Sequence, residues 1–144
     1  MQIHFNGAAQ TVTGSQYIID INGRRLMLEC GLFQGKRSQY YERNLNFRFP
    51  PESIDAVLLS HAHIDHSGNL PNLVRQGFSG QIYATPASVR LTEIMLLDSG
   101  HIQEADAEFV NHKRLRRGEE LIEPLYTQQD AAQVAQHLIG IPYN

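Results

Sequence analysis

The chain has 144 residues, of which 42% are hydrophobic and 19% charged, and its formal net charge is −3. This size and composition fit one soluble globular domain and exclude a disordered or fibrous chain. The negative charge gives no global attraction to nucleic acid, so binding RNA or DNA would need a local basic patch. The single cysteine, Cys30, rules out an internal disulfide and fits a reducing compartment.

The N-terminus gives no sign of export or membrane insertion. Its first ten residues, MQIHFNGAAQ, lack the basic and then apolar pattern of a signal peptide. No apolar run approaches the roughly 20 residues that a membrane-spanning helix needs. We therefore expect a cytoplasmic protein with no membrane contact.

The first half of the chain predicts β-strands. Asn22-Gly23 is a strong signal for a two-residue hairpin turn between two of them. The sequence SIDAVLLS at residues 53–60 becomes apolar in its second half, which predicts a strand buried on both faces. Residues 35–51 are polar and aromatic, and predict an excursion with a helical turn. The other expected strands are residues 2–5, 16–21 and 24–29.

The second half predicts mainly helices. Asn69 is placed to cap a helix ending at Gly77, and residues 81–84 predict a short strand. Thr85-Pro86 opens a further helix, whose many apolar side chains predict that it is well buried. These side chains are Val89, Leu91, Ile94, Met95, Leu96 and Leu97.

Gly100 is a candidate interruption of that helix, and residues 101–117 continue as a polar helix. Thr127 and Asp130 resemble a capping box before a last helix at residues 131–138. Because the last fifty residues contain no segment that predicts a strand, the sheet has few partners. The expected fold class is α/β, with one mixed sheet and packed helices, and the domain looks incomplete.

Metal-capable side chains cluster in HAHIDH at residues 61–66. His61, His63 and Asp65 share a period of two, so in an extended segment they point to one side, while His66 diverges. This arrangement suits two metal ions, with His61 and His63 on one and Asp65 and His66 on the other. Imidazole and carboxylate ligands favour zinc, with manganese or iron as alternatives.

These residues carry a family resemblance that covers nearly the whole chain. HAHIDHSG after an apolar strand resembles the signature of the metallo-β-lactamase superfamily. The flanking stretches resemble its β-CASP branch of nucleic-acid-processing enzymes, which includes ribonuclease J-like and mRNA 3′-end processing nucleases. These stretches are GAAQTVTGS, MLECGLFQGKR, YATPAS, DSGHIQEADAEFVNHKRLRRG and EPLYT.

The resemblance implies that residues 1–144 form the N-terminal part of an αββα sandwich whose second half is missing. The helical segment 86–138 would lead toward the missing remainder. It also implies a metal-dependent ribonuclease with two zinc ions, one held by His61 and His63 and the other by Asp65 and His66. Asp65 and His66 would also serve catalysis, and the substrate would be an RNA phosphodiester.

The chain departs from the family at Glu29, where aspartate usually supports the metal-binding loop. Glutamate keeps the charge but is one methylene longer, which can shift the ligands it supports. The family also takes further histidine and acidic ligands from later segments. The other histidines here do not match those motifs and are interpreted as surface or packing residues: His4, His101, His112 and His137.

Two consequences follow from this partial site. With two protein ligands for each ion, zinc occupancy should be partial or weak. A half-sandwich leaves an apolar face uncovered, so the chain is expected to associate with itself. Lys36 and Arg37 could contact phosphates of RNA, or equally be solvated surface charges, whereas the basic run at residues 113–117 is interpreted as the end of a helix.

Two other interpretations stay open at this point. The chain could be a catalytically inactive structural or partner-binding fragment, or a thioester or lactone hydrolase of the same superfamily. RNA and DNA both remain possible substrates, as do endo- and exonucleolytic cleavage.

Overall fold

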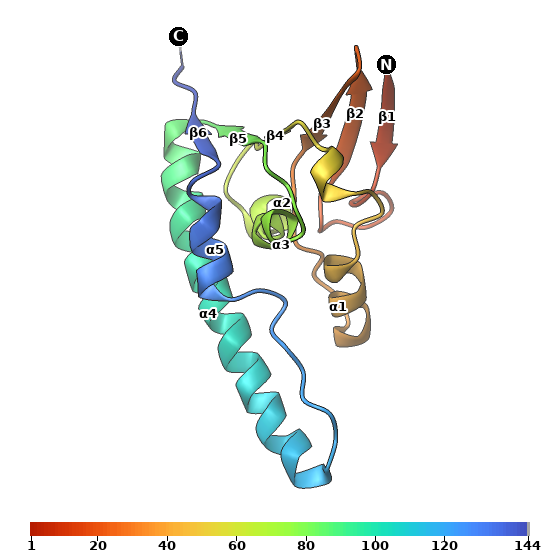
Figure 1. Cartoon of the computed structure of the whole chain (residues 1–144), viewed down its shortest axis with the longest axis vertical. Coiled ribbons are helices and arrows are strands. Elements are labelled where there is room, and N and C mark those ends of the chain that lie inside the picture. The colour runs from red at the N-terminus through yellow and green to blue at the C-terminus, as the bar shows by residue number, and fades with distance from the viewer. Residues whose placement is uncertain (144) are drawn as a thin grey trace.

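The computed structural model describes residues 1–143, apart from the side chains of Arg37 and Ser38. It contains one six-stranded sheet with helices packed against it (Figure 1). The strands are β1 (Gln2–Phe5), β2 (Tyr17–Ile21), β3 (Arg24–Leu28), β4 (Ala56–Leu58), β5 (Gln81–Ala84) and β6 (Leu138–Gly140). The helices are α1 (Arg37–Leu45), η1 (Pro51–Ser53), α2 (Ile64–Ser67), α3 (Leu70–Arg75), α4 (Pro86–Arg117) and α5 (Gln128–Val134).

The strands lie in the sheet in their order along the chain. β1, β2 and β3 pair antiparallel, whereas β3, β4, β5 and β6 pair parallel, so the sheet is mixed. The antiparallel turn between β2 and β3 is formed by Asn22 and Gly23, which have φ angles of 50° and 74°. Two successive left-handed residues define the hairpin turn that this dipeptide predicts. The α/β class and the mixed sheet are therefore confirmed.

The two faces of the sheet differ in what covers them. On one face, Ile18, Met27, Val57 and Ile82 form a registered row of side chains that are at most 2% exposed. This row belongs to the hydrophobic core together with side chains of α3 and α4: Leu70, Leu73 and Leu96. The helices therefore supply the partner that the apolar side of the sheet needs.

The opposite face carries a second registered row that crosses all six strands. It consists of Phe5, Tyr17, Leu28, Leu58, Tyr83 and Ile139. Leu58 is 39% exposed, Ile139 37% and Phe5 66%. The expectation that residues 53–60 form a strand buried on both faces is therefore wrong, because β4 has three residues and helices cover only one of its faces.

The prediction that the last fifty residues lack a strand is also wrong. β6 pairs parallel with β5, and the chain reaches it directly after α5. The expected helix at residues 131–138 runs instead over Gln128–Val134, and Thr127 and Asp130 form its predicted capping box. His137 follows this helix, and its Nδ1 atom lies 2.8 Å from the carbonyl oxygen of Gly80.

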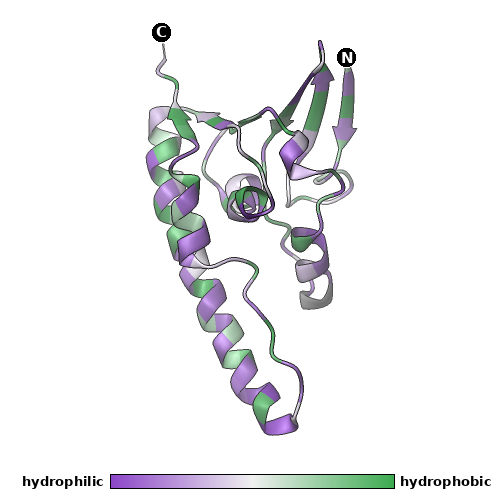
Figure 2. Ribbon diagram, in the orientation of Figure 1, coloured by the Kyte–Doolittle hydropathy of each residue, from purple (hydrophilic) through white to green (hydrophobic). Residues whose placement is uncertain are grey.

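Three other local expectations need correction. The excursion contains a nine-residue helix, α1, and not merely a helical turn. Asn69 precedes α3 without capping it through its side chain, whose Nδ2 atom donates to the carbonyl of Asn44. Hydrophobic residues recur along α4, as the colours of Figure 2 show, yet Leu91 and Ile94 are exposed and only Leu96 of the predicted apolar set is fully buried.

Gly100 does not interrupt a helix, because α4 is one helix of 32 residues from Pro86 to Arg117. The absence of a side chain at Gly100 lets the start of α5 pack closely against α4. A Cβ atom on Gly100 would lie 2.8 Å from the backbone nitrogen of Gln128 and 3.0 Å from its Cα. Among residues 1–143, no helix combines the length and apolar content that crossing a membrane requires.

The contact at Gly100 yields a prediction on stability. In an exposed helix, Gly→Ala stabilises by about 1 kcal/mol. Here Gly100→Ala should instead lower the unfolding free energy by about 1 kcal/mol, because the added methyl meets backbone atoms that cannot rotate away. Urea denaturation measures the change, and Gly100→Val should cost more. Ala105→Gly, at an exposed site of α4, calibrates the helix propensity, and a stabilised Gly100→Ala protein would contradict this packing.

Candidate metal centre

The candidate centre lies at one edge of the sheet, where two parallel strands end side by side. Leu28 and Leu58 are partners in the register of β3 and β4. The residues that follow them, Glu29 and Leu59–Ser60, therefore leave the sheet at the same edge. Glu29 and Leu58 also remain joined, since the Glu29 amide donates to the Leu58 carbonyl at 3.1 Å.

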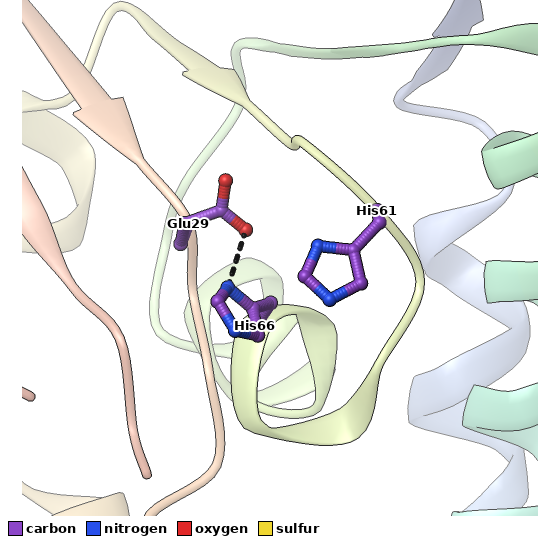
Figure 3. Close-up of side chains that lie close together, drawn as sticks. All are labelled: Glu29, His61 and His66. Atoms are coloured by element: carbon purple, nitrogen blue, oxygen red, sulfur yellow. Dashed lines mark hydrogen bonds and ion pairs between the residues drawn. The ribbon is translucent and has the colours of Figure 1, made fainter. Parts of the chain in front are cut away.

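Glu29 holds the metal-binding loop at two points. Its Oε1 atom accepts a hydrogen bond from the Ser60 amide at 2.9 Å. Its Oε2 atom lies 3.2 Å from Nδ1 of His66, the contact drawn in Figure 3. Glu29 is only 8% exposed, and its φ of 60° is in the left-handed region. That conformation costs a residue other than glycine roughly 1–2 kcal/mol. Hydrogen bonds to a charged group contribute about 1.5–3 kcal/mol each, so the two bonds more than offset the strain.

His66 and Asp65 lie in α2, which begins at Ile64. The expectation that the segment stays extended through Asp65 is therefore wrong: the chain turns into helix directly after His63. The contact between Nδ1 of His66 and Glu29 leaves Nε2 as the nitrogen available to a metal. This Nε2 lies 3.5 Å from Oδ2 of Asp65, so the two residues can serve one ion together.

His61 and His63 lie on the loop between β4 and α2. Nδ1 of His61 lies 2.8 Å from Oγ of Ser60, which again leaves Nε2 for a metal. The His61 ring centroid is 4.6 Å from that of His63 and 4.2 Å from that of His66. His63 is exposed, whereas His61, Asp65 and His66 are partly buried. All four predicted ligands thus lie in one cluster.

The tightest grouping of donor atoms adds Glu29 to this cluster. One donor atom from each of Glu29, His61 and His66 can be chosen so that all three lie within 4.8 Å of one another (Figure 3). The side chains come from the end of β3, the loop after β4 and α2. Imidazole nitrogens and carboxylate oxygens are donors that zinc accepts, so this set fits a divalent metal ion. His63 and Asp65 stand beside this group and not within it.

The backbone around residues 64–66 is fixed by the segment that follows β3. Cys30 donates to the His66 carbonyl at 2.8 Å and Leu32 to the Ile64 carbonyl at 2.9 Å. A Cβ atom on Gly31 would lie 1.7 Å from the Asp65 carbonyl oxygen, so only glycine permits this approach. These contacts and the role of Ser60 were missed from the sequence. The small residues Cys30 and Gly31 directly after Glu29 were a local signal that the backbone there approaches another segment closely.

No described contact joins Lys36, a predicted substrate contact, to this cluster. Lys36 is exposed and directly precedes α1, and the side chain of Arg37 lies outside the described part of the chain. Cys30 is completely buried, and burial raises the pKa of its thiol well above the ordinary value. At the far end of α4, Arg114 and Arg117 pair with Glu119, which agrees with the structural interpretation of that basic run.

Comparison with known proteins identifies the family. Residues 10–127 match the model of the metallo-beta-lactamase superfamily. The chain belongs to this superfamily.

Two relatives carry ribonuclease names. "Ribonuclease TTHA0252" of Thermus thermophilus is 39% identical over 95% of the chain, and "Probable RNase MJ4" of Methanocaldococcus jannaschii is 30% identical over 100% of it. The chain spans 27% and 29% of the lengths of these two proteins. Among solved structures, the short form of human tRNase Z is similar over all of this chain and 47% of its own, with a TM-score of 0.45 and 17% identity.

The contacts of Glu29 yield a prediction on metal affinity. Glu29→Gln keeps the length of the side chain but removes the charge that holds Nδ1 of His66. Zinc affinity should fall about 10- to 100-fold, as for other residues that orient metal ligands. Competition with a chromophoric chelator measures it. Glu108→Gln on the exposed surface of α4 is the control, and an unchanged affinity in Glu29→Gln would contradict the orienting role.

Proposed function

We propose that this chain carries the metal-binding segment of a β-CASP-type ribonuclease with a two-zinc centre. In this proposal residues 1–144 form the N-terminal part of a larger metallo-β-lactamase domain. The observation that carries it is the contact of Glu29 with Nδ1 of His66, which presents Nε2 beside the Asp65 carboxylate. The ribonuclease names of two relatives support RNA as the substrate.

Each residue of the cluster has a distinct task in this proposal. His61 and His63 would hold one ion, and Asp65 and His66 the other. When bound, such ions supply positive charge that stabilises a phosphodiester, and they lower the pKa of a water molecule to near neutral pH. Glu29 holds the His66 ring and, through the Ser60 amide, the start of the loop. The Asp65 carboxylate would also accept a proton during catalysis, and His66 beside it would take part in the same step.

Hydrolysis of labelled RNA tests the proposal. After incubation with zinc, the protein should cleave a single-stranded oligoribonucleotide, and a strong chelator should abolish cleavage. Asp65→Asn and His63→Ala should each lower the rate at least 100-fold, because each removes a predicted ligand. His112→Ala, an exposed histidine on α4, should leave the rate unchanged.

Two outcomes would contradict the proposed activity. Stoichiometric zinc binding without RNA cleavage would favour a binding or structural segment. Faster hydrolysis of a thioester or lactone than of RNA would favour another branch of the superfamily.

We also propose that the apolar row on the open face of the sheet mediates self-association. The row crosses all six strands, and Leu58 lies in its centre with 39% exposure. Light scattering coupled to gel filtration should find a dimer or larger species. Leu58→Gln should shift it toward monomer, whereas Leu91→Gln on the exposed side of α4 should not. A monodisperse monomer of the unmodified chain would contradict this surface.

A further inference from the structure

A hollow of about 540 Å³ lies between the loop after β1 and helix α1. The loop contributes residues of the stretch 6–16, and α1 with the segment after it contributes Arg43, Asn44 and Arg48. None of these residues belongs to the candidate metal centre.

The hollow lies at the same edge of the sheet as the candidate metal centre. Phe5 and Tyr17, which flank the loop, are in register with Leu28 and through it with Leu58, after which the metal-binding loop begins. The end of the loop is bonded directly to that segment, since the Ser15 amide donates to the Asp65 carbonyl at 2.9 Å. The loop side of the hollow is therefore bonded directly to the segment that carries the candidate ligands.

The α1 side of the hollow is basic in a chain that is acidic overall. Residues 36–48 contain four basic residues and one acidic residue, whereas the whole chain has a net charge of −3. Arg43 and Arg48 both line the hollow. Among the residues that the structure describes, neither pairs with a carboxylate. Their charge is thus available to an anion.

Two features of the lining make it more than a charged surface. The Cζ atom of the Arg43 guanidinium lies 4.3 Å from the centroid of the Phe33 ring, a cation–π contact that favours this position of the side chain. On the loop side, the Nδ2 atom of Asn6 is buried in the lining of the hollow without a hydrogen-bond partner. A buried amide donor without a partner is costly, and a bound acceptor removes that cost.

We propose that this hollow is a subsite for one nucleotide of a single-stranded RNA, next to the phosphodiester held at the metals. Arg43 and Arg48 bind a phosphate, and the Asn6 amide, whose Nδ2 atom is buried in the free protein, turns toward the hollow to donate to an oxygen or nitrogen of the ribose or base. Guanidinium groups suit the oxygens of a phosphate. The identity of the polymer rests on the proposed function, whereas the phosphate chemistry of the hollow does not.

Binding without cleavage tests the subsite. The anisotropy of a fluorescein-labelled oligoribonucleotide is measured with a chelator present, so that no metal-dependent cleavage occurs. Arg43→Gln and Arg48→Gln should each raise Kd about 3- to 10-fold. The slope of log K against log salt should fall by about 0.7 for each lost phosphate contact. Glu42→Gln removes the one acidic side chain of the lining and should lower Kd.

Matched variants separate this subsite from general charge. Arg90→Gln, exposed on α4, should leave Kd unchanged. Arg43→Gln also removes the contact with Phe33 and could therefore disturb the fold. Arg48→Gln is the second variant because Arg48 has no described contact whose loss would do so. An unchanged Kd in both arginine variants, or no binding by the unmodified protein, would overturn the proposal. So would equally strong competition by poly-glutamate, because the site would then select charge and not nucleotides.

The binding experiment can be interpreted whether or not the chain cleaves RNA. Asp65→Asn should bind the oligoribonucleotide as the unmodified protein does, while losing cleavage. Arginine-dependent binding without any cleavage would keep the subsite and reject the hydrolysis. Cleavage with an unchanged Kd in the arginine variants would keep the hydrolysis and reject the subsite.

Discussion

The buried carboxylate of Glu29 connects the sheet to the loop between β4 and α2, and the arrangement of the candidate metal ligands depends on it. One oxygen holds the Ser60 amide at the start of the loop, and the other holds Nδ1 of His66 at its end. The residue adopts a left-handed backbone conformation that brings its side chain to both partners. An uncharged side chain would hold the two ends of the segment 60–66 less strongly.

The parallel register of β3 and β4 places Glu29 beside the loop that follows β4. Because these strands are parallel neighbours, their ends lie at one edge, and the residues that follow them meet there. The loop after β1 arrives at the same edge, since β1 and β2 are in register with Leu28 through Phe5 and Tyr17. The candidate ligands and the basic hollow therefore lie at the same edge of the sheet although they come from different parts of the chain.

Local signals in the sequence predicted the elements whose structure is locally determined. The strands at residues 2–5 and 81–84, the Asn22-Gly23 turn and the Thr127 capping box agree with the structure because neighbouring residues specify them. β6 could not be predicted in this way. Three residues, LIG, form a strand because β5 offers a parallel edge, and nothing in their own pattern distinguishes them from a helix end.

The site shows the same division between local and tertiary causes. Spacing in HAHIDH predicted the cluster of ligands, and the structure places all four side chains together. Spacing could not show that α2 begins at Ile64, because that start depends on backbone bonds from Cys30 and Leu32. Likewise, apolar residues such as Ile94 and Leu97 predicted a buried α4, but apolarity does not determine which face a partner covers.

The orientation of the ligands has a consequence for how strongly this chain can bind metal. In the proposed centre, residues 61–66 would provide two protein ligands for each of two ions, whereas stable zinc sites use three or four. Affinity then depends on how little the ligands must reorganise on binding. Glu29 and Ser60 already hold Nδ1 of His66 and Nδ1 of His61, so each ring presents Nε2 before a metal arrives. Pre-orientation by hydrogen bonds therefore contributes affinity that the number of ligands alone would not provide.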